Sequence, residues 1–155
     1  MRGALVICAI VALVAIGTAE ALASNDQLSQ LPGRGRPALS MGGTALTLVG
    51  IALSIAVYAA LGIALGRARA RESTVLLTGM VVGAGAGLIG GAIRAFLVRE
   101  YLGGVLAASG LADLLIVTLV VFVSLSVLVS VAAGASLTWL SFRAGRARRT
   151  PRPPS

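Results

Sequence analysis

Long apolar runs, separated by short polar or arginine-rich segments, account for most of this chain. Three of these runs are long enough to cross a bilayer as helices, which takes about 20 residues each: residues 41–66, 74–98 and 111–142. A shorter apolar run occupies residues 4–17. The pattern predicts an all-α fold: a small polytopic membrane helix bundle with three transmembrane helices and one further apolar segment at the N-terminus.

The N-terminal segment, residues 1–23, allows two interpretations. Ala21 and Ala23 stand just before Ser24 and fit the small-x-small pattern of a signal-peptidase site, so the segment is a signal peptide in the first interpretation. In the second, it stays in the membrane as a fourth transmembrane helix. In both, we expect residues 24–40 to form an external loop, because they are polar and contain two prolines and two glycines.

The composition supports a membrane protein. Charged residues make up 12% of the 155 residues, whereas about 25% is typical of soluble domains. The apolar runs leave only short connections and ends. We therefore expect one transmembrane bundle over residues 41–142 and no soluble domain.

The run at residues 74–98 carries a regular row of glycines, one at every fourth residue, which places the row on one face of a helix. In lipid, such a face lets another helix approach closely, because helix contacts there depend on small residues. The run at residues 111–142 carries small residues at the same spacing. We predict that the two faces pack together as a glycine zipper. Its residues are Gly79, Gly83, Gly87 and Gly91 on one helix and Ser126, Ser130, Gly134 and Thr138 on the other.

Three polar side chains within the apolar runs, Arg94, Asp113 and Tyr58, need individual explanation. Arg94 lies near the end of its run and either extends to the lipid headgroups or binds an anion or an acidic partner within the membrane. Asp113 is the only acid close to the last run, so our hypothesis for the second case is an Arg94–Asp113 ion pair at the outer ends of the last two helices. Tyr58 lies near the middle of its run, and we expect its hydroxyl to have an internal hydrogen-bond partner.

The residues that carry enzyme chemistry are scarce. The chain has no histidine, one cysteine at position 8, and five acidic residues that lie in loops or near the ends of runs. We therefore expect a non-enzymatic protein without a cofactor or a bound metal. All 13 basic residues are arginines that flank apolar runs. This placement favours the lipid bilayer over nucleic acid as the partner.

A short motif follows the glycine row. Residues 90–94, GGAIR, resemble the GG-x-x-R segment of small four-helix fluoride channels. The likeness covers five residues, and the asparagine and paired-phenylalanine features of that family are not found. In size, number of spans and basic tail, the chain is also similar in general form to phage holins.

Two classes of function fit these observations. The first is a non-enzymatic helix-packing or assembly subunit that pairs with a second copy of itself or with another membrane protein. The alternative is a small oligomeric pore or transport component whose lumen is lined by the hydroxyl-bearing stripe.

The placement of the arginines predicts the orientation, because short cytoplasmic segments of membrane proteins are enriched in arginine and lysine. With the N-terminus inside, nine arginines are cytoplasmic and four are external. We therefore expect a multi-pass protein of the cell membrane in which residues 143–155 form a basic cytoplasmic tail. The inner set is Arg2, Arg67, Arg69, Arg71, Arg143, Arg146, Arg148, Arg149 and Arg152, and the outer set is Arg34, Arg36, Arg94 and Arg99.

Reporter fusions test this orientation. A green fluorescent protein joined after Ser155 should fluoresce, and an alkaline phosphatase at the same place should be inactive, because that position is cytoplasmic. Fusions after Arg36, in the external loop, should give the opposite pattern and serve as the matched control. An active phosphatase at Ser155 would contradict the orientation.

Overall fold

The computed structural model describes residues 2–29 and 41–147, and this part of the chain is almost entirely helical. Each of its four α-helices is long and apolar enough to cross a membrane, which confirms an all-α bundle of apolar helices. One turn of 3-10 helix, η1, precedes the last α-helix. The helices are α1 (Arg2–Ser29), α2 (Met41–Arg67), α3 (Glu72–Ala108), η1 (Ala112–Leu114) and α4 (Leu115–Ala147).

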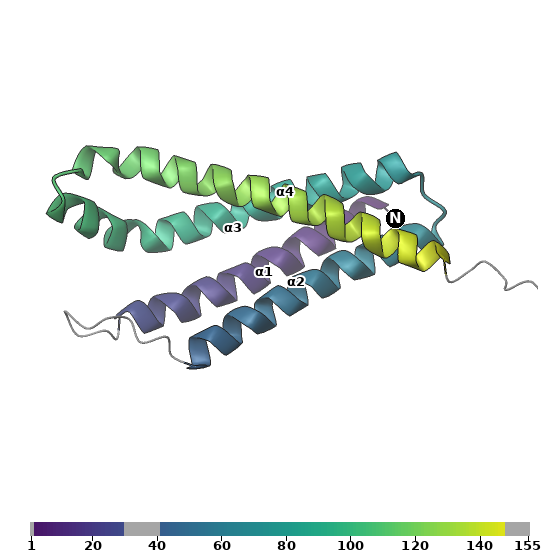
Figure 1. Cartoon of the computed structure of the whole chain (residues 1–155), viewed down its shortest axis with the longest axis horizontal. Helices are drawn as coiled ribbons and strands as arrows, with labels where there is room; N and C mark the ends of the chain where they lie inside the picture. Colours follow the sequence, from purple (N-terminus) through teal and green to yellow (C-terminus); the bar gives the residue numbers. More distant parts are fainter. Residues whose placement is uncertain (1, 30–40, 148–155) are drawn as a thin grey trace, which may run out of the picture.

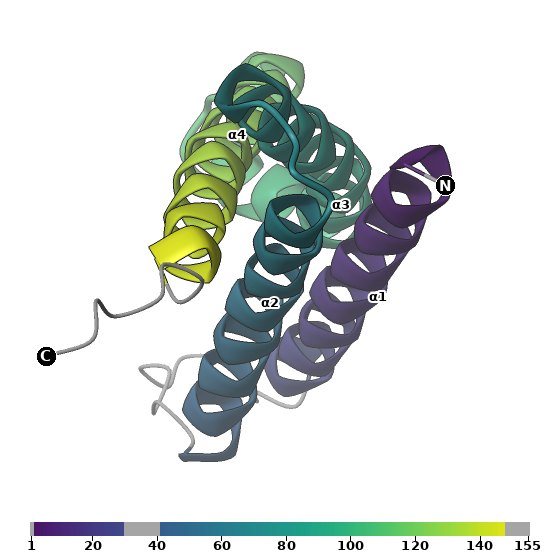
Figure 2. The same ribbon diagram turned by 90° about the vertical axis from the view of Figure 1, so that its right-hand side faces the viewer.

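The four helices form two pairs. The most extensive contact joins α3 to α4; α2 also packs on α4, and α1 packs on α2 and α3. The two pairs lie close together at the end that holds the α2–α3 turn and separate toward the other end (Figure 1). The first residues of α1 and the last residues of α4 lie at that close end, which faces the viewer in Figure 2. The start of α1 and the end of α4 therefore lie on one side of the bundle.

The helices extend further than the apolar runs predict. The apolar run at residues 74–98 predicts a helix that ends at residue 98, but α3 continues to Ala108 and includes Gly103 and Gly104. It ends where Gly110 adopts a left-handed conformation with φ of 71°. The amide of Leu111 then donates to the Leu106 carbonyl at 2.8 Å, which closes the last turn. Glycines within a long apolar segment thus remain helical, and only the glycine that can satisfy the terminal carbonyls ends the helix.

The expected loop and tail are also partly helical. Residues 24–29, at the start of the predicted external loop, belong to α1, and residues 143–147 of the predicted tail belong to α4. The rest of that loop, residues 30–40, and of that tail, residues 148–155, lie outside the described residues. The last four zipper residues all fall within α4, in agreement with the predicted last span.

An arginine-rich turn joins α2 to α3. The amide of Ala70 donates to the Leu65 carbonyl at 3.1 Å, and Arg69 adopts a φ of 52°, which is unfavourable for a residue with a side chain. Beside this turn, the Arg143 guanidinium lies 3.8 Å from the Glu72 carboxylate and stacks on the Trp139 ring at 4.0 Å. The charged ends of α2, α3 and α4 therefore lie at one level of the bundle.

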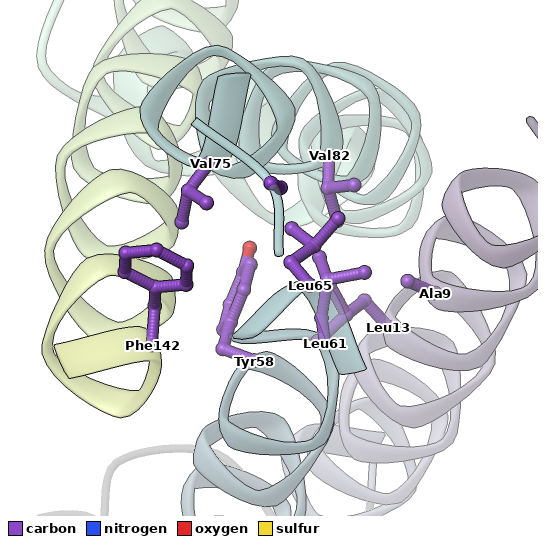
Figure 3. Close-up of a cluster of buried hydrophobic side chains, with 9 residues drawn as sticks. Ala9, Leu13, Tyr58, Leu61, Leu65, Val75, Val82 and Phe142 are labelled. Carbon is purple, nitrogen blue, oxygen red and sulfur yellow. The ribbon is translucent and has the colours of Figure 1, made fainter. Parts of the chain in front are cut away.

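The core of the bundle is at this close end. Phe142, Val75 and Val82 are fully buried, and Tyr58 is 5% exposed. Figure 3 shows the side chains of these residues converging from α2, α3 and α4, with Leu13 and Ala9 of α1 closing one side. In lipid this cluster holds the helices together by dispersion contacts and not by exclusion of water, since the surroundings are equally apolar.

Candidate functional site

The glycine row of α3 lies directly against the backbone of α4. A methyl group at Gly79 would stand 2.5 Å from the carbonyl oxygen of Gly134, and one at Gly83 would overlap the carbonyl oxygen of Ser130. A methyl group at Gly87 would lie 2.9 Å from the Ser130 side chain. Real side chains do not tolerate such distances, so only glycine fits at these positions.

The contacts follow one antiparallel register. Each step of four residues along α3 moves the facing Cα atom four residues back along α4, from Ala135 opposite Gly79 to Val123 opposite Gly91. A methyl group at Gly91 would lie 3.1 Å from the Ser126 side chain, so the interface is slightly looser at this end. The structure thus brings seven of the eight zipper residues into one α3–α4 interface.

The eighth zipper residue, Thr138, contacts α2. A methyl group at Gly62 of α2 would overlap the carbonyl oxygen of Thr138 and lie 2.8 Å from the Ser141 side chain. Thr138 is fully buried, and its hydroxyl has no hydrogen-bond partner within the described residues. The small-residue stripe of α4 therefore packs on α3 along most of its length and on Gly62 of α2 at its C-terminal end.

Arg94 binds Glu20 of α1 and not Asp113. Its Nη2 donates to the Glu20 carboxylate at 2.6 Å, and this ion pair joins α3 to α1. Asp113 is exposed in η1, and no ion pair connects it to Arg94 in the part of the chain that the structure describes. The Arg94–Asp113 hypothesis is thus corrected: the partner of Arg94 is an acid of the first helix and not the acid at the start of the last span.

Glu20 reaches this position because α2 leaves room for it. A methyl group at Gly50 of α2 would overlap the Glu20 carboxyl group, so that group lies directly on the α2 backbone. The Glu20 side chain is 16% exposed. Sequence reasoning placed Glu20 at the end of a segment with a cleavage pattern and did not consider it as a partner.

A pocket that is partly open to the outside of the bundle, here called the cavity, lies next to the ion pair. Its volume is about 350 Å³, and residues of all four helices line it. Most of the wall is apolar, with Leu13, Phe122, Leu125 and Val129 among the lining residues. The polar groups on the wall are the Arg94 guanidinium and the hydroxyl-bearing side chains of Tyr58, Ser126 and Ser130.

Tyr58 differs from its expected environment. It is buried, as expected, but its hydroxyl has no hydrogen bond within the described part of the chain. Figure 3 shows the phenol oxygen pointing away from α2 into the space between the helices. The cavity therefore has a cation at Arg94 and a phenol at a separate point of its wall.

The charged and apolar parts of this arrangement are suited to binding an anionic group. An arginine remains protonated at any physiological pH and serves as a hydrogen-bond donor and not as an acid or base. Among the described residues, no three His, Cys, Asp or Glu side chains lie close enough to hold a metal ion. The site can hold an anion against the guanidinium and an apolar group against the aliphatic wall.

Alanine substitutions test the glycine interface. Gly83→Ala should destabilise the bundle by about 1–3 kcal/mol, because the added methyl group overlaps the α4 backbone. Gly90→Ala is the matched control, since a methyl group there has nothing within 4 Å. It should be neutral or stabilise α3 by up to about 1 kcal/mol through helix propensity. Thermal unfolding in detergent, followed by circular dichroism, measures both, and equal stability would contradict the close approach.

No protein-family model, curated protein or solved structure matches this chain.

Proposed function

We propose that this protein is a non-enzymatic, multi-pass membrane protein that acts as a small transport component and handles an anionic solute in the cavity between its helix pairs. The observation that supports this is the Arg94 guanidinium on the cavity wall. A guanidinium that lines a cavity at the membrane boundary can attract an anionic solute. The α3–α4 interface consists of glycines, small side chains and backbone, so its packing does not need this charge.

The position of Arg94 along α3 supports access from one side of the membrane. Arg94 comes 22 residues after Glu72, the first residue of α3. At 1.5 Å per residue this is about 33 Å, close to the ~30 Å thickness of the hydrocarbon core. If the arginine-rich end marks the cytoplasmic boundary, the Arg94–Glu20 pair stands near the external boundary. The cavity then extends from that boundary into the membrane.

The same contacts favour a retained first helix. Ala9 and Leu13 belong to the buried core, and Glu20 binds Arg94. Cleavage after Ala23 would remove all three contacts. We therefore include residues 1–23 in the working protein as helix α1, with both chain ends cytoplasmic.

Intact-mass measurement of the protein purified from membranes tests this. The mass should include residues 1–23. A mature chain that begins at Ser24 would contradict the proposal, because α1 would then be absent from the bundle.

A second candidate, an assembly subunit that pairs with a second copy of itself, is favoured by the far part of the α3–α4 pair. Beyond Arg94, large apolar side chains face outward: Phe96 is 73% exposed and Ile116 is 74% exposed. The apolar span of α3 has 37 residues, whereas that of α1 has 20. The α3–α4 pair therefore extends past its neighbours, and a second copy would cover the excess.

Ion release from liposomes distinguishes the two candidates. In liposomes loaded with potassium chloride, the full chain should release chloride severalfold faster than potassium, because the guanidinium of the Arg94–Glu20 pair lines the cavity and the carboxylate does not. Arg94→Gln should reduce chloride release toward the level of protein-free liposomes. A bilayer that stays tight to both ions would contradict the transport function and support the assembly subunit.

Arg99→Gln is the matched control for this experiment. Arg99 lies on the same helix but does not line the cavity between the helix pairs. It removes the same charge from the protein surface, so chloride release should remain as in the wild type. Equal losses in both variants would show that only the surface charge matters.

A further inference from the structure

The cavity combines one cationic end with an apolar body, and this combination narrows the class of ligand. Its lining residues on α3 run from Ala86 to Arg94, which is about 12 Å of helix. Its volume of about 350 Å³ is at the lower end of the range of small-molecule sites. The cavity is thus elongated and small, with its charge at one end.

The Arg94 guanidinium already binds the carboxylate of Glu20. The Glu20 carboxylate accepts one hydrogen bond from Arg94, through Nη2 alone. A guanidinium has five N–H donors and binds a carboxylate best through two parallel bonds. The Arg94 side chain remains 42% exposed in this pair. The Glu20 carboxylate therefore accepts from only one nitrogen of Arg94. Arg94 also lines the cavity, where its other N–H groups could donate to a ligand.

On the basis of the transport function proposed above, we propose that the cavity binds a small amphiphilic carboxylic acid, whose carboxylate takes the place of Glu20 on Arg94. The apolar body of the acid lies along Leu13, Phe122 and Leu125, toward Tyr58. Glu20 is then an internal competitor that holds Arg94 when the ligand is absent. The acid reaches the cavity either from water, as a medium-chain acid, or from the bilayer, as a long-chain acid.

Removing the competitor should strengthen binding. In nanodiscs of zwitterionic lipid at neutral pH, equilibrium dialysis with labelled octanoate should show saturable binding above that of empty nanodiscs. Glu20→Gln should bind octanoate about fivefold more tightly, the net contribution expected for a partly exposed ion pair. Arg94→Gln should lose the saturable component, and octanol should show none. Wild-type affinity in Glu20→Gln, or saturable binding in Arg94→Gln, would overturn the proposal.

Filling the cavity tests the same proposal without breaking the ion pair. Gly90 lines the cavity, and a methyl group there would have nothing within 4 Å. Gly90→Leu should therefore place a side chain in the cavity, leave thermal unfolding unchanged and abolish octanoate binding. Unchanged binding in this variant would overturn the proposal even if Arg94→Gln fails to fold.

Two comparisons separate this inference from the proposed function. Palmitate supplied in the bilayer and octanoate supplied in water distinguish the two sources, and saturable binding of either one supports the inference. Chloride release without saturable binding of either acid would overturn the inference and leave the transport function standing. Binding in bilayers that release no ion would support the ligand class and contradict transport.

Discussion

The close approach of two helix backbones holds this molecule together. At Gly79 and Gly134, the carbonyl oxygen of each residue occupies the space where a side chain on the other would stand. In water such a contact would be one among many apolar contacts, but in lipid the apolar surface gains little by leaving its surroundings. Shape and proximity therefore decide which helices pair. The α3–α4 pair provides the surface on which the other two helices pack.

The cavity follows from how that surface is used. Gly62 of α2 packs against the small-residue stripe of α4 near Thr138. The side chains of Phe142, Val75 and Tyr58 fill the same end of the bundle. Toward the other end the helix pairs separate, and the contact there is the polar one between Glu20 and Arg94 (Figure 1). Tight packing at one end and an ion pair at the other leave an elongated space between them.

Much of this architecture could be predicted from the chain alone. The apolar runs predict four apolar helical segments, and a glycine at every fourth residue in one run with small residues at the same spacing in another indicates which faces are alike. The observed register agrees with that spacing, because both rows advance by about one turn per contact. The helix ends were harder to predict, since Gly103 and Gly104 look like a connection but lie within α3.

The polar part of the site could not be predicted in the same way. Arg94 was recognisable as an unusual charge, but its partner depends on how α1 lies against α3, which no local pattern encodes. The expected position at the outer ends of the last two helices favoured Asp113, whereas the three-dimensional arrangement brings Glu20 from the first helix. The cavity is likewise a property of four helices together. The local periodicity of a sequence indicates which helix faces carry small residues. It does not indicate the size or lining of a cavity that forms between four helices.

The Glu20–Arg94 contact also imposes an order on biogenesis. Its two residues are 74 positions apart, and the acid is made first. At typical elongation rates of 5–20 residues per second, α1 exists for about 4–15 s before its arginine is synthesised. During that interval the first helix carries a carboxylate toward the membrane without the cation that later holds it. The N-terminal helix is therefore the first to be made, and its ion pair with α3 is among the last contacts that it forms.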